Sequence, residues 1–146
     1  MFSDNIKLLH YLFAIYQRAF VLQFIEEETA QLMPNFTKIA SPQIAGKMLA
    51  KATSLQRLAL MPSSGIQLLG AEKSLFRHMK HGGKPPKHGI LYQHSLVKRV
   101  SKRNKGKMAR TLAGKLSIAL KEDYFGKKDI SKQLLEKLER RAKELQ

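Results

Sequence analysis

The sequence predicts an all-α protein, and three observations support that fold class. Apolar residues recur at spacings of three and four over most of the 146 residues, which is the period of helices with one buried face. Prolines and glycines fall between these periodic segments, where they end helices or form loops. Only residues 89–94 are expected to be extended, and for a few residues at most. A chain of this length can bury a hydrophobic core.

The first predicted helix covers residues 4–33. Ser3 or Asp4 can cap its start, because a side-chain oxygen accepts a free backbone N–H there, and Pro34 ends it. Residues 8–25 are apolar almost all round, and helices of this kind are usually buried. We therefore expect either a central helix of a bundle or part of a helical hairpin that packs on a partner.

This apolar helix is not expected to cross a membrane or to direct secretion. Gln17, Arg18 and Gln23 interrupt it, and no second apolar run follows. Its basic start is weak and no small-residue cleavage site follows, so a signal peptide is also disfavoured. The three glutamates at 26–28 are interpreted as a solvated face rather than a metal site.

The second predicted helix begins at Ser41 and ends before Pro62. The Ser41 hydroxyl is expected to cap it, and Pro42 suits the first position because proline has no N–H to leave unpaired. Its buried face is expected to hold Ile44, Met48, Ala52, Leu55 and Ala59. Residues 63–65, Ser-Ser-Gly, are expected to break the chain before a short apolar run.

A short basic helix is predicted for residues 71–80, and Gly70 before it lets a partner or another helix approach the backbone closely. Three apolar side chains are expected to pack inward: Leu75, Phe76 and Met79. Three cations share the other face: Lys73, Arg77 and Lys80. Residues 81–88 read as a loop, and Ser95 is expected to cap a short turn that runs to Val100.

Two longer helices are predicted near the end of the chain, at about 104–124 and 129–145. The core stripe of the first is Ala109, Leu112, Ala113, Leu116 and Ala119. Its opposite face carries Arg103, Lys107 and Arg110, so one helix can belong to the core and also bind phosphates. Asp129 is expected to cap the last helix. The apolar seam of that helix is Leu135, Leu138, Ala142 and Leu145.

The formal net charge of +16 is concentrated in one part of the chain. No acidic residue lies between Glu72 and Glu122, and that span holds 14 Lys or Arg and four His. Such localised charge indicates a polyanionic partner, with nucleic acid as the first candidate and an anionic membrane surface as the second. The remaining alternative is a solvated basic face without a dedicated partner.

Catalysis, metal binding and a cofactor are not expected. There is no Cys, and Glu72 is the only carboxylate at the basic region, so the histidines alone would carry acid–base chemistry. The four histidines at 78, 81, 88 and 94 lack a carboxylate or thiol to complete a zinc site. An RNA-modifying or RNA-cleaving enzyme and a peripheral membrane protein are kept as alternatives to a non-catalytic RNA-binding protein.

Three ordered stretches of the sequence resemble the Nop domain family. They are residues 62–77 (PSSGIQLLGAEKSLFR), 86–92 (PKHGILY) and 105–115 (KGKMARTLAGK), and the pair Pro34-Asn35 also fits. The resemblance covers about residues 30–125. Members of that family are scaffold proteins of the box C/D guide RNPs for ribose 2′-O-methylation, and a related spliceosomal U4-binding protein.

The resemblance implies an arrangement of domains and a function. Residues 1–40 would be an N-terminal helix left from a coiled-coil region, and residues 41–146 an all-α Nop domain that binds RNA and RNP. The domain would dock on a kink-turn RNA already held by a small, ribosomal-type kink-turn-binding protein, and neither alone would suffice. A general structured-RNA-binding protein without a methylation role is the alternative.

The resemblance also implies partners and a compartment. A fibrillarin-like methyltransferase would carry the catalysis and join indirectly, residues 4–33 would serve self-association, and no membrane would be bound. Such a protein would be cytoplasmic in a prokaryote or archaeon and nucleolar or nuclear in a eukaryote.

The expected RNA-binding residues come from the GAEK region, the loop after it and the basic segments. They are Gly70, Ala71, Glu72, Lys73, Arg77, Lys80, Lys84, Lys87, His88, Gln93, His94, Lys98, Arg99, Lys102, Arg103, Lys105, Lys107 and Arg110. Two positions depart from the family pattern. Gln93, next to His94, stands where the family usually has His, and Lys98-Arg99 replace a common Pro-Pro pair, which increases the attraction for phosphates at some cost in rigidity.

Overall fold

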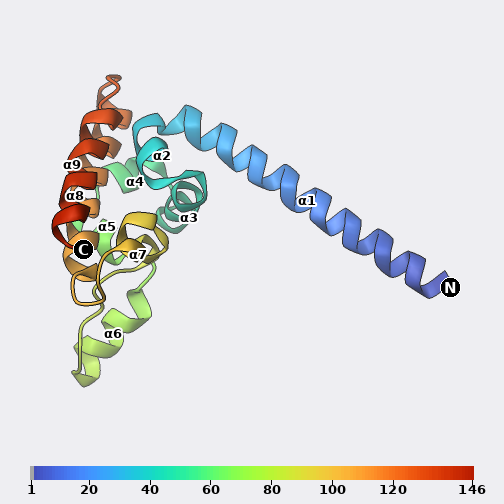
Figure 1. Cartoon of the computed structure of the whole chain (residues 1–146), viewed down its shortest axis with the longest axis horizontal. Helices are drawn as coiled ribbons and strands as arrows, with labels where there is room; N and C mark the ends of the chain where they lie inside the picture. The colour runs from blue at the N-terminus through green and yellow to red at the C-terminus, as the bar shows by residue number, and fades with distance from the viewer. Residues whose placement is uncertain (1) are drawn as a thin grey trace.

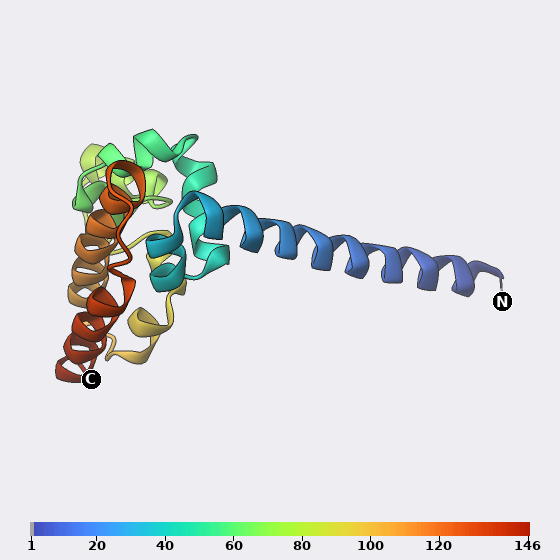
Figure 2. The same cartoon turned by 90° about the horizontal axis from the view of Figure 1, so that it is seen from above.

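The computed structural model describes residues 2–146, with side chains from residue 5 onward, and over this range the secondary structure is helical without strands. The helices are α1 (Phe2–Leu32), α2 (Pro34–Ala40), α3 (Pro42–Ala52), α4 (Leu55–Leu60), α5 (Ser63–Leu68), α6 (Glu72–His81), the 3₁₀ helix η1 (Ile90–Gln93), α7 (Ser95–Arg99), α8 (Lys105–Phe125) and α9 (Ser131–Glu144). The predicted all-α class is confirmed. Most helices form one body, from which α1 and α6 project (Figures 1 and 2).

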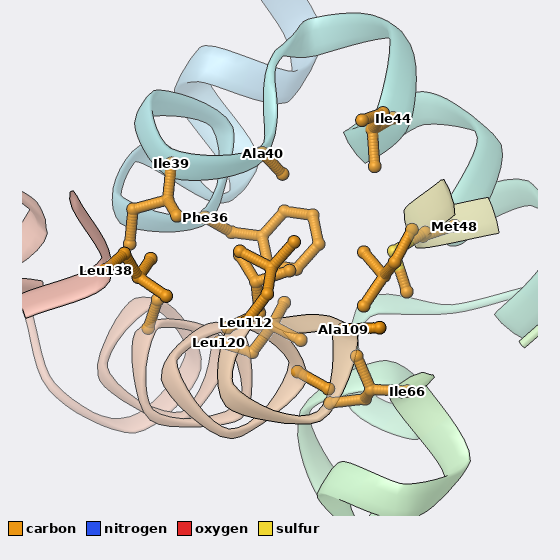
Figure 3. Close-up of a cluster of buried hydrophobic side chains, with 14 of the residues drawn as sticks. Phe36, Ile39, Ala40, Ile44, Met48, Ile66, Ala109, Leu112, Leu120 and Leu138 are labelled. Carbon is orange, nitrogen blue, oxygen red and sulfur yellow. The ribbon is translucent and has the colours of Figure 1, made fainter. Parts of the chain in front are cut away.

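The core of this body is organised around α8. Helices α2, α4, α5, α7 and α9 all contact α8. The five residues predicted for its core stripe are buried, as are Met108 and Leu120. Phe36 from α2 and Ile66 from α5 are fully buried and lie beside α8 in the cluster that also contains Leu112 and Ala109 (Figure 3). The basic residues on the other face of α8 are therefore held by a helix that cannot move without disturbing the core.

Helix α1 leaves the body and runs into solvent (Figure 2). The prediction of a central bundle helix is wrong for this chain, because the large apolar side chains of α1 between Ile6 and Phe24 are exposed. Only the end of the helix contacts α2 and α3, and Thr29 is buried there. By length and composition, residues Asn5–Leu32 would also suffice to cross a membrane.

A buried amide joins three helices. The Asp123 carboxylate accepts the main-chain N–H groups of Asn35 (3.0 Å) and Phe36 (2.9 Å), which have no helical partner at the start of α2. The Asn35 amide donates to Asp123 Oδ1 (2.7 Å) and to the Lys128 carbonyl (2.9 Å). Its Oδ1 accepts the N–H of Ile130 (2.8 Å) where α9 begins. Asn35 therefore ties the starts of α2 and α9 to the end of α8.

Asp129 supports the start of α9, although the cap position lies one residue later than predicted. The cap position is Ile130, and Asp129 Oδ1 accepts the N–H (3.1 Å) and the hydroxyl (2.6 Å) of Ser131. Asp129 also pairs with Lys38 at 2.6 Å. The hydrogen bond from the Lys38 ammonium is the main cause that lowers the pKa of Asp129 to about 2. The predicted seam of α9 is buried at Leu138, Ala142 and Leu145 and half-buried at Leu135; it also includes Leu134.

The single helix predicted after Ser41 is two helices. Thr53 has a left-handed φ of 69°, and the Ser54 hydroxyl accepts the N–H of Arg57 (3.2 Å) to start α4. The predicted Ser41 cap is also wrong, since its side chain makes no capping bond. Ser41 has a φ of 85° and joins α2 to α3 through its main chain, whose N–H donates to the Thr37 carbonyl (3.0 Å).

Three further local predictions are corrected. Residues 63–65 do not break the chain but begin α5, whose Ile66 is fully buried. The segment expected to be extended forms η1. The cap of α7 is His94 rather than Ser95, because the His94 ring accepts the N–H of Leu96 through Nδ1 (3.2 Å).

The stability of the fold is expected to fall in mild acid because of His94. Its Nδ1 accepts a bond from Leu96, so its Nε2 carries the proton and donates to the Ile39 carbonyl (2.8 Å). Burial lowers the pKa of His94 below its ordinary 6.5, so the unfolded chain binds the proton more readily. The contribution is complete above pH 6.5 and declines as the pH falls below it, so the free energy of unfolding should be lower at pH 5.5 than at pH 7.5. Urea unfolding at both pH values measures this loss, which His94→Asn should remove; an equal loss in the variant would contradict it.

Candidate nucleic-acid interface

A hollow of about 460 Å³ lies between the loop before η1, the start of α8 and the end of α9. We call it the basic groove, and its lining residues are Gln67, Pro85, Pro86, Lys87, Arg103, Gly106, Lys107, Arg110, Thr111 and Arg141. Half of these residues are cations and none is acidic. Such a concave surface focuses positive potential and favours a polyanion over a neutral ligand.

The groove wall formed by Lys87 is held against α5 and α8. Gln67 Nε2 donates to the Lys87 carbonyl (2.7 Å), and the Gly89 N–H donates to the Gln67 carbonyl (3.0 Å). A Cβ on Gly89 would lie 2.8 Å from the carbonyl carbon of Leu69, so only glycine permits this contact. On the other side, the Lys87 side chain packs over Gly106 of α8, where an added Cβ would lie 3.3 Å from it and require a small shift.

The cations from α8 and the turn before it are available to a ligand. Arg103, Lys107 and Arg110 are exposed, at spacings of four and three. The ion pairs in the part of the chain that the structure describes do not involve these three residues. Arg141, which sequence reasoning missed, completes the groove and pairs with Glu144 (2.6 Å). The periodicity of α9 indicates which residues pack, but it does not indicate that the helix end faces α8.

A second group of predicted residues lies on α6 and on the loop that follows it as far as Lys84. We call this segment, residues 72–84, the arm. Lys73, Arg77, Lys80 and Lys84 are exposed there. The predicted inward packing of Phe76 and Met79 is wrong: they are 65% and 72% exposed, because α6 projects from the body and buries no residue (Figure 1). Leu75 is half-buried. The arm thus presents both cations and apolar side chains to solvent.

The residues at the base of the arm have roles within the chain. Gly70 has a φ of +90°, and a Cβ on it would lie 2.7 Å from the Ile90 side chain, so the close approach expected there is made by this chain itself. Glu72 Oε1 accepts the Gly70 N–H (2.8 Å), and Oε2 faces Lys51 Nζ at 3.4 Å. The bond from Gly70 is the main cause that lowers the pKa of Glu72. Glu72 and Gly70 therefore fix the direction in which the arm leaves the body.

The remaining predicted residues fall into two sets. Gln93 accepts a bond from Lys47 (2.6 Å), and Arg99 pairs with Glu139. His94 is 6% exposed and uses both ring nitrogens inside the chain, so it is removed from the candidate interface. The other set is exposed or half-buried: Ala71, His88, Lys98, Lys102 and Lys105. The described residues contain no group of three His, Cys, Asp or Glu arranged to hold a metal ion.

An all-helical body with a basic groove and a basic arm belongs to the class of domains suited to bind a polyanion such as nucleic acid, and comparisons with known proteins specify the family. The Nop family model, described as "snoRNA binding domain, fibrillarin", matches residues 8–144. The chain therefore belongs to the Nop family.

Relatives and a solved structure agree with this assignment. An uncharacterized NOP5 family protein of Methanocaldococcus jannaschii is 43% identical over 129 residues, which is 88% of this chain and 31% of the relative. Nucleolar protein 58 of Schizosaccharomyces pombe is 39% identical over 112 residues, 77% of this chain and 22% of the relative. A crystal structure of a fibrillarin/Nop5p complex aligns with a TM-score of 0.73 and 37% identity, over 99% of this chain and 52% of that chain. The chain thus spans about a fifth to a third of the length of these curated relatives.

Proposed function

We propose that this chain is a non-catalytic module that docks on a kink-turn RNA already bound by a kink-turn-binding protein, as in box C/D guide RNPs for ribose 2′-O-methylation. The observation that carries the proposal is the basic groove, in which five cations and no carboxylate surround a hollow on a rigid helical body. Contacts of this kind position an RNA backbone but carry little sequence information. Specificity would come from the shape of the kinked RNA and from the protein that holds it.

The proposed interface consists of the basic groove and the arm. The proposed start of the RNA-binding domain also differs from the boundary expected from the sequence. Helix α2 contributes Phe36, Ile39 and Ala40 to the core, so we place the start of the RNA-binding domain at Pro34 rather than after residue 40. Helix α1 would be the extension that precedes it. In a eukaryote the module would act in the nucleolus, because eukaryotic relatives are named Nucleolar protein 58. In an archaeon, such as the source of the NOP5 family relative, it would act in the cytoplasm.

The arm is tested by replacing Lys73 and Arg77 together with Ala. Each lost phosphate contact costs close to one order of magnitude at 0.1 M salt, so assembly on the preformed RNA–protein complex should weaken about tenfold or more. Native gel electrophoresis measures the assembly, and circular dichroism should show unchanged helicity. Wild-type assembly by the variant would remove the arm from the interface.

Helix α1 is proposed to associate with a second copy of the chain. Its apolar side chains, such as Leu12 (55% exposed) and Phe20 (65% exposed), have no surface of this chain to pack on. Because burial of such side chains stabilises association by about 1.5–3 kcal/mol each, the wild-type protein should sediment as a dimer or larger species. The variant with Leu12 and Phe20 replaced by Glu should sediment as a monomer. A monomeric wild-type protein would contradict the proposal.

A peripheral membrane protein is the second candidate function, because α1 is exposed, apolar and long enough to enter a bilayer. Co-sedimentation with anionic vesicles in the absence of RNA distinguishes the RNP module from a peripheral membrane protein. The RNP module should stay in solution when α1 is paired with a second copy, whereas a membrane protein would pellet with the vesicles.

A further inference from the structure

Two aromatic rings are stacked at the surface beside the basic groove. The rings of His88 and Tyr92 lie 4.6 Å apart between centroids, with an interplanar angle of 28°. Lys105 Nζ lies 4.8 Å from the centroid of the Tyr92 ring and 3.4 Å from its hydroxyl. Tyr92 is 42% exposed and His88 is half-buried. The stack is therefore reachable from solvent and is not part of the core.

The main chain around the stack is fixed on both sides. The residue before His88 is held by the bond from the Gln67 amide to the Lys87 carbonyl, and the residue after it by the bond from the Gly89 N–H to the Gln67 carbonyl. Tyr92 belongs to η1, and its N–H donates to the Gly89 carbonyl (3.1 Å). A surface that is ordered before binding loses less conformational entropy when a ligand arrives.

The neighbours of the stack indicate the chemistry of its ligand. Lys87, the residue before His88, lines the basic groove, and Lys105 precedes the groove residues Gly106 and Lys107 on α8. A strand whose phosphates occupy the groove would therefore place a base close to the His88 ring. An aromatic ring at such a position is a stacking surface for a nucleobase that is not paired.

We propose that His88 and Tyr92 form a stacking platform for one unpaired nucleobase of the bound RNA, with His88 as the ring that contacts the base. This inference rests on the proposed RNA binding and deepens it. It gives His88 a role different from that of the surrounding lysines, because stacking depends on a flat ring and not on positive charge. Tyr92 supports His88 from behind and Lys105 holds Tyr92 in place.

The test compares two probes with the full chain at low salt. One is a single-stranded oligouridylate RNA, and the other is an abasic ribose–phosphate chain of the same length and charge. Fluorescence anisotropy should show that the wild-type protein prefers the RNA by about 5- to 150-fold, which is the range expected for one stacked base. The His88→Ala variant should lose the preference, and His88→Phe should keep it. The control variant Lys87→Ala should lower the affinity for both probes by the same factor.

The outcomes separate this inference from the proposed function. The stacking proposal is overturned if the wild-type protein binds both probes equally well, or if His88→Ala lowers the affinity for both by the same factor. In either case the proposed phosphate-binding interface stands. If His88→Phe loses the preference, stacking is overturned in favour of a hydrogen bond from the imidazole. If neither probe binds at low salt, the platform is overturned, whereas the proposed docking on the RNA–protein complex is decided by its own titration.

Discussion

Reversal of charge at Arg103, Lys107 and Arg110 to Glu is expected to lower the RNA affinity at least about 100-fold at 0.1 M salt. The three side chains line the basic groove and are exposed. Each cation that neutralises a phosphate releases close to one counterion, so three lost contacts should make the slope of log K against log salt less steep by about 2 to 3. For the wild-type protein, about six contacts predict a slope near −5. Titrations of the assembled RNP at several salt concentrations measure both quantities.

The matched control reverses three lysines at the other end of α8. Lys127, Lys128 and Lys132 are exposed and lie around the turn between α8 and α9. A helix of 21 residues is about 30 Å long, so this set is remote from the groove. It carries the same change in net charge but should leave the slope nearly unchanged. Equal losses from both sets would mean that the total charge of the chain, and not the groove, attracts the RNA.

Replacement of Asn35 by Ala is expected to lower the free energy of unfolding by about 3 kcal/mol. The Asn35 side chain donates to Asp123 and Lys128 and accepts from Ile130, and the residue is 4% exposed. Alanine leaves these groups without partners where water does not reach them easily, and each unpaired group costs about 1–3 kcal/mol. Urea unfolding followed by circular dichroism measures the loss.

The control for Asn35 is Gln133→Ala on the exposed face of α9. A surface substitution of this kind should change the free energy of unfolding by no more than about 0.5 kcal/mol. If the two variants were equally stable, the amide would not be the junction of α2, α8 and α9.

The parts of the fold that depend on local pattern could be predicted from the sequence. The core stripe of α8 and the cations on its other face follow from spacings of three and four, and the structure confirms both placements. The Nop motifs also indicated the family correctly. In contrast, the contact between Asn35 and Asp123 joins residues 88 positions apart, and neither residue belongs to an apolar period that would indicate the pairing.

The errors on α1 and α6 have the same physical origin. Periodicity shows that a helix has an apolar face, but it does not show what covers that face. Phe76 on α6 was expected to pack inward, and Phe20 lies on the helix for which a central place in a bundle was one of two expectations; both side chains are 65% exposed. Arg141 was missed for a related reason, because its place in the groove depends on the packing of α9 along α8. The sequence therefore predicts helices better than the surfaces between them.

The central claim is that a rigid helical body presents its basic groove to an RNA already shaped by another protein. The most direct measurement is a native-gel titration of the chain against three targets: kink-turn RNA alone, its primary binding protein alone, and the complex of the two. The account predicts tight, salt-sensitive binding to the complex and much weaker binding to either component. Equal affinity for free RNA and for the complex would contradict it.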